Sequence, residues 1–450
     1  MTNNDTIVAI ASPHGMGGIS IIRLSGPSAA NVADDFFCAK SGVKIKDSKH
    51  AKMNFGTFDL DGVIEKGYAV FFKNPKSFTG EDVVEFQVHG GTIIAEKIIE
   101  KCKKLGARIA DKGEFSKRAF LNGKASLDSL EGMIDMIESE SEAELRAASM
   151  LHNGKLYKEL EKIESNIVDV LSEIEVAIDY PDEIDEITTI EKVVKISKQE
   201  KEKIDQLLKT KASGKMLKNG VRTAIVGKPN VGKSSILNSI LGEDRAIVTD
   251  IEGTTRDTLH ETFVINGVKF SLVDTAGIRE TSDIIESIGV KKAKQNITEA
   301  DLVLFVIDGT RKLDYNDKEI EELSKNTKSI LVLNKIDEKL NNDVKQFFDT
   351  WQGDKIEISA KSGLNVDKLI QKMLNHAKYN SVDGFVVTNE RHIAALEAAS
   401  DNLAKINNKQ NLDLAAFCLN STLIEIGKIT GKTASEEIVN RVFSRFCVGK

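Results

Sequence analysis

The segment GKPNVGKS at residues 227–234 constrains this chain more than any other stretch, because it matches the pattern G-x-x-x-x-G-K-[ST]. It follows the apolar run RTAIVG and opens KSSILNSILG, which has a helical pattern. A glycine-rich loop between a strand and a helix wraps its backbone amides around phosphates. We therefore expect Lys233 to reach the β- and γ-phosphates and the Ser234 hydroxyl to bind magnesium, within an α/β domain.

Two later motifs indicate which nucleotide base is recognised. SILVLNKID at residues 329–337 ends a strand in Asn-Lys-x-Asp, so Asp337 can accept hydrogen bonds from guanine N1–H and its exocyclic amine. Asn334 and Lys335 brace the base, and the backbone of Ser359-Ala360-Lys361 can donate to guanine O6. Adenine lacks this pattern of donors and acceptors. The set therefore predicts GTP.

The steps of hydrolysis are less fully specified by the residues. FSLVDTAG ends in Asp-x-x-Gly, which places Asp274 beside the metal and the Gly277 amide near the γ-phosphate. The order of P-loop, TDIEGTTRD and DTAG resembles the translation-factor-related Ras-like GTPases, with Thr255 as second magnesium ligand. Ras-type enzymes orient water with a glutamine at the position that Ile278 occupies here. The candidates left open to stabilise charge or orient water are Arg256, Arg279, Glu280, Asp283 and Glu286.

Composition limits the class of protein. A chain of 450 residues exceeds one hydrophobic core, and a net charge of −7 gives no overall attraction to nucleic acid. The cysteines at positions 38, 102, 418 and 447 lack metal-ligand spacing, which suits a reducing compartment. No signal peptide and no run of about 18 apolar residues is visible, so we expect a cytoplasmic protein without a membrane span.

Pattern along the chain predicts four domains. Residues 1–120 mix strands, such as 17–26 and 81–91, with helices, such as 93–107, and read as an α+β domain. Helical patterns fill 121–219 and return at 380–450, and the P-loop block at 220–379 alternates strands and helices. An insertion needs only a surface loop whose ends lie close together. We therefore expect a Ras-like GTPase domain inserted into a helical domain.

The last residues, RFCVGK, are unusual for a chain end, because tails generally fray and are polar. Phe443, Phe446 and Val448 surround Cys447 with apolar side chains, which predicts that the tail is docked on the protein. Free cysteines are mostly small buried hydrophobes, and we expect that packing role for Cys38, Cys102 and Cys418.

Several segments together resemble the MnmE (TrmE) family of tRNA-modifying GTPases over the whole chain. They are DTIVAIASP, GGISIIRLSG, SFTGEDVVEFQVHGG, GEFSKRAFLNGK, PNVGKSS, TDIEGTTRD, DTAGIRE and the final FCVGK. The resemblance implies that residues 1–120 bind a tetrahydrofolate and form a homodimer. It also implies an FAD-dependent MnmG-type partner, and modification of carbon 5 of the wobble uridine of certain tRNAs with a one-carbon unit.

The family's folate contacts match Arg23, Glu85, Lys124 and Lys450, for 5-formyl- or 5,10-methylene-tetrahydrofolate. The resemblance also gives Cys447 a part in tRNA modification. Glu85 shares a strand face with Gln87 and His89, which by itself would usually just meet water. His89 lies in QVHGG where relatives more often carry Gly-His-Gly-Gly, so we expect it to be structural.

The resemblance extends to the GTPase chemistry. It implies a potassium ion held by Asn230, Thr249, Ile251 and Thr254, in the place of an arginine finger. It assigns Glu286 as the residue that orients water, although Ser287 follows it where relatives often have arginine. The magnesium ligands remain Ser234 and Thr255. The full GTP-binding set predicted from motifs and resemblance is Asn230, Val231, Gly232, Lys233, Ser234, Ser235, Thr249, Asp250, Ile251, Glu252, Gly253, Thr254, Thr255, Asp274, Thr275, Ala276, Gly277, Asn334, Lys335, Asp337, Ser359, Ala360 and Lys361.

Two other functions share part of this pattern. A GTPase switch in ribosome assembly shares the P-loop asparagine, but we find no GXXG loop of a KH domain to bind RNA, and that role does not require the Cys-Val-Gly-Lys ending. A dynamin-like scaffold would need a membrane or stalk surface that the helical pattern does not indicate.

Overall fold

The computed structural model describes residues 5–13, 15–242, 247–248, 262–273, 294–325, 327–377 and 385–449. The chain forms two compact units. The first unit comprises residues 1–134, 150–189 and 410–450, and the second comprises residues 135–149 and 190–409. Three helices, α4 (Leu127–Glu138), α5 (Glu142–His152) and α7 (Glu186–Leu208), cross the division. The boundaries between the four predicted segments of the chain stay a prediction.

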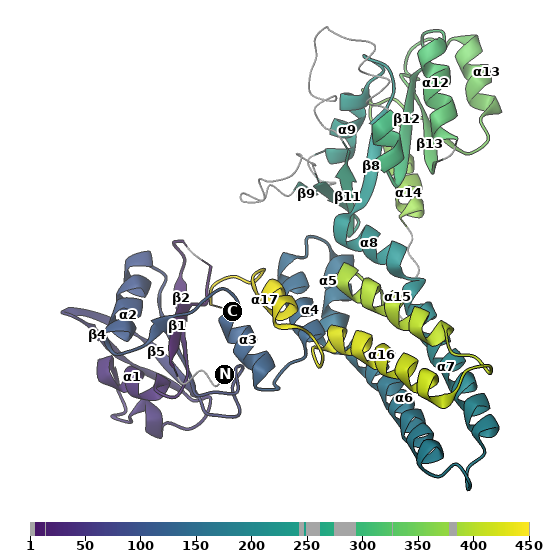
Figure 1. The fold of residues 1–450 in the computed structure, drawn as a ribbon. Coiled ribbons are helices and arrows are strands. Elements are labelled where there is room, and N and C mark those ends of the chain that lie inside the picture. Colours follow the sequence, from purple (N-terminus) through teal and green to yellow (C-terminus); the bar gives the residue numbers. More distant parts are fainter. Residues whose placement is uncertain are drawn as a thin grey trace. The chain divides into compact units, whose positions relative to one another are not determined.

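The first unit contains a sheet with the strand order β3-β4-β5-β6-β2-β1-β7 among its described residues. Figure 1 labels β1, β2, β4 and β5 of this sheet. All neighbours pair antiparallel except β1 and β7. The strands are β1 (Ile7–Ile10), β2 (Ile19–Ser25), β3 (Phe37–Ala39), β4 (Met53–Leu60), β5 (Val63–Phe72), β6 (Val83–His89) and β7 (Arg108–Ile109). The predicted strands at 17–26 and 81–91 are thus β2 and β6.

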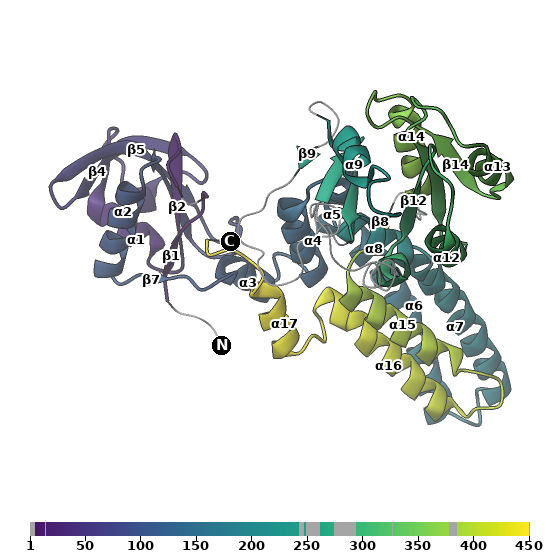
Figure 2. The ribbon, with the colours of Figure 1, turned by 90° about the horizontal axis from the view of Figure 1, so that it is seen from above.

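Alternation along these strands separates a core face from an open face. In β6, Val84, Phe86 and Val88 are buried while Glu85 and Gln87 are half-buried on the other face. Helices α1 (Ala29–Phe36) and α2 (Thr92–Lys104) lie on the core face (Figure 2). The rings of Phe36 and Phe86 meet edge to face at 5.3 Å. The open face is therefore left for polar groups.

Helices make up the rest of the first unit. The heptad seam predicts α6 (Lys155–Asp179), which ends just before Tyr180-Pro181 and packs beside α16 (Leu412–Thr430). Ser435, one of the two predicted caps, accepts a hydrogen bond from Ile438 N at the start of α17 (Glu436–Phe443). Helix α3 (Glu114–Leu121) and the short 3-10 helix η1 (Ile45–Asp47) complete the described helices. Apolar side chains of α4 and α17 pack with Phe446 in one core, which anchors the C-terminal part of the chain.

The second unit contains a sheet with the strand order β14-β13-β12-β8-β11-β10-β9 among its described residues. Strands β8, β11, β12, β13 and β14 pair parallel, and β9 and β10 pair antiparallel at one edge. The strands are β8 (Val221–Val226), β9 (Ile247–Val248), β10 (Thr262–Ile265), β11 (Val268–Leu272), β12 (Leu302–Asp308), β13 (Ser329–Asn334) and β14 (Asp354–Glu357).

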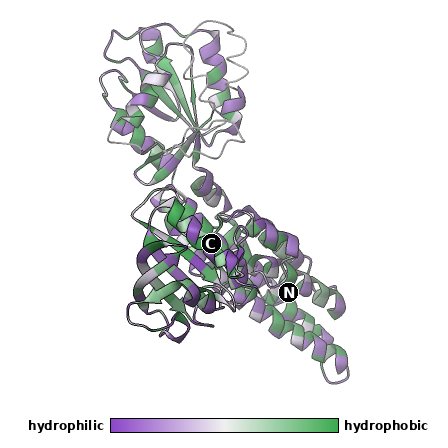
Figure 3. Cartoon of the chain, turned by 90° about the vertical axis from the view of Figure 1, so that its left-hand side faces the viewer, coloured by the Kyte–Doolittle hydropathy of each residue, from purple (hydrophilic) through white to green (hydrophobic). Residues whose placement is uncertain are grey.

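Helices cover both faces of this parallel sheet, so its central strands are apolar on both sides (Figure 3). Helices α9 (Lys233–Leu241) and α14 (Val366–His376) contribute to one core, and α12 (Tyr315–Ser324) and α13 (Asn342–Thr350) to the other. Every residue of β12 is buried. The arrangement places the carboxyl ends of the parallel strands, where ligands bind in such sheets, at one edge.

A helical part of the second unit contacts the β10–β11 hairpin. Helices α8 (Lys211–Asn219) and α15 (Glu390–Ala404) belong to it, and Ala147, Leu217 and Val386 form a small core. Lys269 of β11 forms an ion pair with Glu140 at 2.9 Å and with Glu144 at 3.6 Å, just before and within α5. No helix among the described residues is both long and apolar enough to cross a membrane.

Candidate functional site

The loop between β8 and α9 has the backbone that its sequence predicts. Gly227 has φ +152°, and a Cβ there would lie 2.3 Å from the Val306 carbonyl, so only glycine fits against β12. Asn230 has φ +63° and Gly232 has φ +100°. These turns bring the chain to the N-terminus of α9, which begins at Lys233. The predicted strand–loop–helix context is confirmed.

Lys233 lies folded against this loop. Its Nζ donates to the carbonyls of Gly227 and Lys228, both at 2.8 Å. Burial, and then the nearby charge of Arg311, lower the pKa of Lys233 below its usual range. An anionic phosphate beside the ammonium group would reverse that effect, because an opposite charge favours the charged form.

The Asn334 side chain links the phosphate loop to the Ser-Ala-Lys loop, which is predicted to contact the base. Its Nδ2 donates to the Val231 carbonyl at 2.8 Å, and its Oδ1 accepts from Ala360 N at 3.0 Å. The side chain is buried. The Lys335 ammonium group forms a 2.6 Å ion pair with Asp308, at the end of β12. A fixed scaffold thus surrounds the predicted base site.

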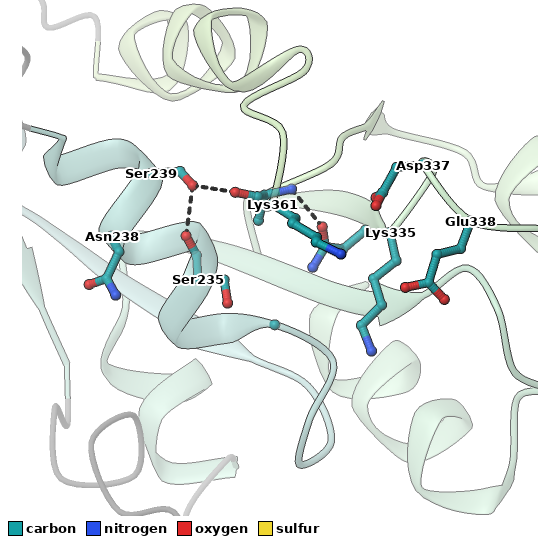
Figure 4. A pocket seen from close by; sticks show the side chains of 10 residues that line it. Ser235, Asn238, Ser239, Lys335, Asp337, Glu338 and Lys361 are labelled. Carbon is teal, nitrogen blue, oxygen red and sulfur yellow. Dashed lines mark hydrogen bonds between the residues drawn. The ribbon is translucent and has the colours of Figure 1, made fainter.

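A pocket of about 500 Å³ lies between these loops (Figure 4). A hydrogen bond from the Ser359 side chain lowers the pKa of Asp337, which favours the ionised carboxylate that the predicted guanine contact requires. The pocket walls include three residues that the motifs did not predict: Asn238, Ser239 and Glu338. Ser239 Oγ donates to the carbonyls of Ser235 and Ala360, both at 2.8 Å, and its helical spacing from Ser235 could have indicated this position.

Part of the predicted GTPase machinery lies outside the described residues. This applies to the proposed water-orienting Glu286, to most of the predicted cation ligands, to Lys450 and to the Asp-x-x-Gly motif. The residues concerned are Thr249, Asp250, Ile251, Glu252, Gly253, Thr254, Thr255, Asp274, Thr275, Ala276, Gly277, Glu286 and Lys450. Their predicted roles stay predictions.

Two of the residues predicted to contact folate, Arg23 and Glu85, meet on the open face of the first sheet. Arg23 and Glu85 are directly opposed on β2 and β6, and Arg23 Nε donates to Glu85 Oε1 at 2.8 Å. The guanidinium lies 6.0 Å from the Phe78 ring centre and 5.7 Å from that of Phe115. Lys124 Nζ donates to the Pro75 carbonyl at 2.8 Å, and so reaches the loop that carries Phe78.

The C-terminal tail docks beside this pair, as its sequence predicts. Arg23 Nη1 donates to the Gly449 carbonyl at 3.4 Å, and Gly113 N donates to the Cys447 carbonyl at 3.3 Å. Phe443 and Phe446 are buried beneath the tail, whereas Cys447 itself is exposed. The tail therefore carries its thiol to the surface within two residues of a contact with Arg23.

Two other expectations concern His89 and the cysteines. His89 Nδ1 lies 2.5 Å from Oε1 of the buried Glu65, and the structural role expected of His89 stays a prediction. The packing role predicted for Cys38 is wrong, because this residue is exposed while Cys102 and Cys418 are buried. Cys38 is the middle residue of the short strand β3, where alternation turns it away from Phe37 and Ala39 and out of the core.

An ionic cluster centred on the buried Arg118 links several elements of the first unit. Arg118 is 3% exposed and contacts the carboxylates of Asp5 at 2.7 Å, Glu114 at 3.0 Å and Glu81 at 3.2 Å. Ser25, at the end of β2, donates to Glu81 at 2.7 Å. The cluster ties the start of the chain, β2, the loop before β6 and α3 together.

The phosphate loop at a helix N-terminus and the Asn-Lys-x-Asp and Ser-Ala-Lys loops around one pocket define a P-loop GTPase. The chain belongs to the MnmE family of tRNA modification GTPases. The family model for the GTP-binding protein TrmE N-terminus matches residues 6–124, and that for the MnmE helical domain matches residues 127–447.

Curated relatives agree over the whole length. The chain is 40% identical over 456 residues to a tRNA modification GTPase MnmE of Clostridioides difficile (strain 630), covering 99% of each chain. It is also 40% identical over 456 residues to the MnmE of Thermotoga sp. (strain RQ2), covering 99% of this chain and 100% of that one. The G domain of the T. maritima FeoB iron transporter is 25% identical over 35% of this chain and 99% of its own, with a TM-score of 0.26. So low a score supports no conclusion.

Proposed function

We propose that this GTPase works with an FAD-dependent MnmG-type protein to modify carbon 5 of the wobble uridine of certain tRNAs, using a one-carbon unit from tetrahydrofolate. The docked tail is the observation that carries this proposal. Cys447 of the tail is exposed, and Gly449, two residues further on, contacts Arg23 of the Arg23–Glu85 pair. A GTPase switch without group-transfer chemistry has no use for that arrangement.

The GTPase half of the proposal rests on the phosphate loop. Backbone amides at the N-terminus of α9 would hold the phosphates, and Lys233 would turn from its carbonyl partners to the β- and γ-phosphates. Ser234 and Thr255 would bind magnesium. Asn230, with Thr249, Ile251 and Thr254, would bind potassium. Glu286 would orient the attacking water.

The residues of the open sheet face fit a tetrahydrofolate. A carboxylate such as Glu85 would accept from the amine and ring N–H donors of a pterin, and Arg23, its ion-pair partner at 2.8 Å, would lie at the same end of the cofactor. Lys124 and Lys450 would suit the carboxylates of the glutamate tail. The rings of Phe78 and Phe115 border the Arg23 guanidinium and offer apolar surface. The bound cofactor would supply the one-carbon unit, and these residues would orient the cofactor beside the C-terminal tail of the chain.

The proposal includes an assembly and a location. We propose a cytoplasmic homodimer formed through residues 1–120. The exposed side of β4 and β5 supports this, since Met53, Phe55, Ile64 and Tyr68 are each at least 40% exposed there, and the rings of Phe55 and Tyr68 meet at 5.3 Å. Apolar surface of this kind gains from being covered.

Nucleoside analysis by mass spectrometry tests the function. tRNA would be compared from a strain that lacks the protein and from that strain complemented with wild type, Cys447→Ser or Cys418→Ser, the last being a matched buried cysteine. We expect loss of the modified wobble uridine, with rescue by wild type and Cys418→Ser only. An unchanged nucleoside profile in the deletion strain would contradict the tRNA role and favour a switch in ribosome assembly.

A further inference from the structure

We propose that Lys228 and Arg311 clamp the phosphate loop from the β12–α12 side and thereby position Asn230 for its cation. The two residues are positioning residues for GTP hydrolysis, since both act through the loop backbone. This inference rests on the proposed function, in which Asn230 binds potassium.

The first arm of the clamp is the Lys228 side chain. It leaves the loop directly after Gly227 and ends between Asp314 and Asp317, with its Nζ 2.7 Å from Asp317 Oδ2. Only 12% of the Lys228 side chain and 6% of that of Asp317 are exposed. Although burial alone lowers it, the hydrogen bonds that Lys228 donates to Asp314 and Asp317 raise the pKa of Lys228, so its ammonium group stays charged.

The carboxylates that receive Lys228 are themselves fixed. Asp314 is the N-cap of α12 and accepts from Asn316 N at 2.9 Å, and Asp317 accepts from Asp314 N at 3.1 Å. In Asp314 the capping box uses Oδ1 and leaves Oδ2 for Lys228, whereas in Asp317 the same Oδ2 atom accepts from Asp314 N and pairs with Lys228. The flexible Lys228 side chain therefore pairs with carboxylates that are held by α12. These ion pairs tie the phosphate loop to the start of α12.

The second arm is the Arg311 guanidinium. Its Nη2 donates to the Pro229 carbonyl at 2.9 Å, and its Nε lies 3.7 Å from the buried carboxylate of Asp308. Asp308 also holds Lys335 at 2.6 Å and accepts from Thr310 N at 2.9 Å. The guanine-binding lysine and the phosphate loop thus share one carboxylate.

The two arms act on consecutive residues just before Asn230. Gly227 is held by its close approach to Val306, Lys228 by its ion pairs and Pro229 by its carbonyl. Asn230 then takes a left-handed conformation at φ +63°, which is uncommon outside glycine although asparagine adopts it more readily than most residues. Loosening either arm should let Asn230 relax and move its side chain away from the cation.

The test measures GTP hydrolysis by the full-length protein over a potassium titration, with GDP affinity measured separately. Lys228→Met keeps the apolar stem and removes the charge, Lys228→Arg restores a cation, and Lys312→Met is the control because this exposed lysine in the same loop contacts Asp343 instead. We expect Lys228→Met to lower kcat about tenfold and to raise the half-saturating potassium concentration at least threefold. GDP affinity should change less than twofold, and Lys228→Arg should recover much of kcat.

Other results would overturn the clamp. A Lys228→Met variant with unchanged potassium half-saturation, or one whose GDP affinity falls in step with kcat/KM, would make Lys228 merely structural. If wild type hydrolyses GTP equally well in sodium and potassium, the potassium part of the proposed function fails. The clamp is then judged by hydrogen exchange of the amides at residues 230–233 with GDP bound, and unchanged exchange in both Lys228→Met and Arg311→Met would refute it.

Discussion

Asn334 Nδ2 donates a hydrogen bond to the backbone carbonyl of Val231 at 2.8 Å, across 103 residues of sequence. The same side chain accepts from Ala360 N, so one carboxamide fixes both the phosphate loop and the Ser-Ala-Lys loop. Because the amide is buried, its role in the scaffold does not depend on a bound nucleotide.

Asn334→Ala should therefore weaken GDP binding and stability together. It leaves a buried carbonyl and a buried amide unpaired, each costing about 1–3 kcal/mol. We expect at least a tenfold loss of affinity for a fluorescent GDP analogue and a lower melting temperature of the nucleotide-free protein. The control is Asn342→Ala at an exposed position on α13. A normal melting temperature with weakened binding would limit Asn334 to base contact.

Arg118→Met should destabilise the first unit. Arg118 pairs with the buried Glu114 and with Glu81 and Asp5, which are partly exposed, and Arg108 would still pair with Asp5 and Glu114. The loss of charge-assisted hydrogen bonds should therefore cost about 1–3 kcal/mol. Chemical denaturation followed by circular dichroism would measure the change. Lys103→Met, at an exposed position on α2, is the control and should change the unfolding midpoint little. A loss under about 1 kcal/mol would show that Arg108 and water compensate these carboxylates without Arg118.

Glu144 should make the second unit less stable as pH rises. Burial raises the pKa of Glu144, although hydrogen bonds from Glu140 N and the charge of Lys269 oppose that effect. Between the ordinary glutamate pKa of about 4.3 and neutral pH, the folded protein then binds more protons than the unfolded chain. Stability is therefore highest near the lower pH and falls as pH rises through the raised pKa.

Glu144→Gln removes this dependence and keeps an oxygen for the backbone amides. We expect its melting temperature at pH 7.5 to exceed that of wild type by roughly 2–4 °C, on the order of 1 kcal/mol, with little difference near pH 4.5. Glu142→Gln in the same turn is the control, since Glu142 is exposed and pairs with Arg146. A lower melting temperature at pH 7.5 would instead show that the ion pair with Lys269 outweighs the cost of burial.

The four cysteines should fall into two classes of reactivity. Cys38 and Cys447 are exposed, whereas Cys102 and Cys418 are buried, and burial raises the pKa of the Cys102 thiol. Since the thiolate is the nucleophile, two thiols should react with an aromatic disulfide reagent within minutes and all four after denaturation. Mass spectrometry of the labelled peptides assigns them. Rapid labelling of Cys418 in the folded protein would contradict the docking of α16.

Gly449→Ala should detach the tail. Gly449 has φ +98°, and a Cβ there would lie 2.1 Å from the Ile10 carbonyl. Gly62 has φ +93° with nothing within 4 Å, so Gly62→Ala carries the same backbone cost without the clash. We expect trypsin to cleave after the exposed Arg445 at least fivefold faster in Gly449→Ala only. Equal rates in both variants would mean that the tail is held by Phe443 and Phe446 alone.

Several local features of this protein, including its motifs and helix ends, could be predicted from the sequence. The P-loop and the Asn-Lys-x-Asp motif fixed the strand–loop–helix context and the base, because phosphate and guanine each demand particular groups at short spacing. Heptad spacing predicted α6, and Tyr180-Pro181 predicted its end at Asp179. The apolar tail correctly indicated docking. The side of β3 to which Cys38 turns was not readable, since three residues carry too little alternation.

Only the tertiary structure decided which distant residues meet. Asn334 and Val231, Lys228 and Asp317, and Arg23 and Gly449 are brought together by sheet order and helix packing, across separations that no local pattern records. The same holds for Lys269, whose two carboxylate partners come from a helical segment far earlier in the chain. Short-range preferences specify elements and motifs, whereas contacts between them arise from burial of the whole apolar surface at once.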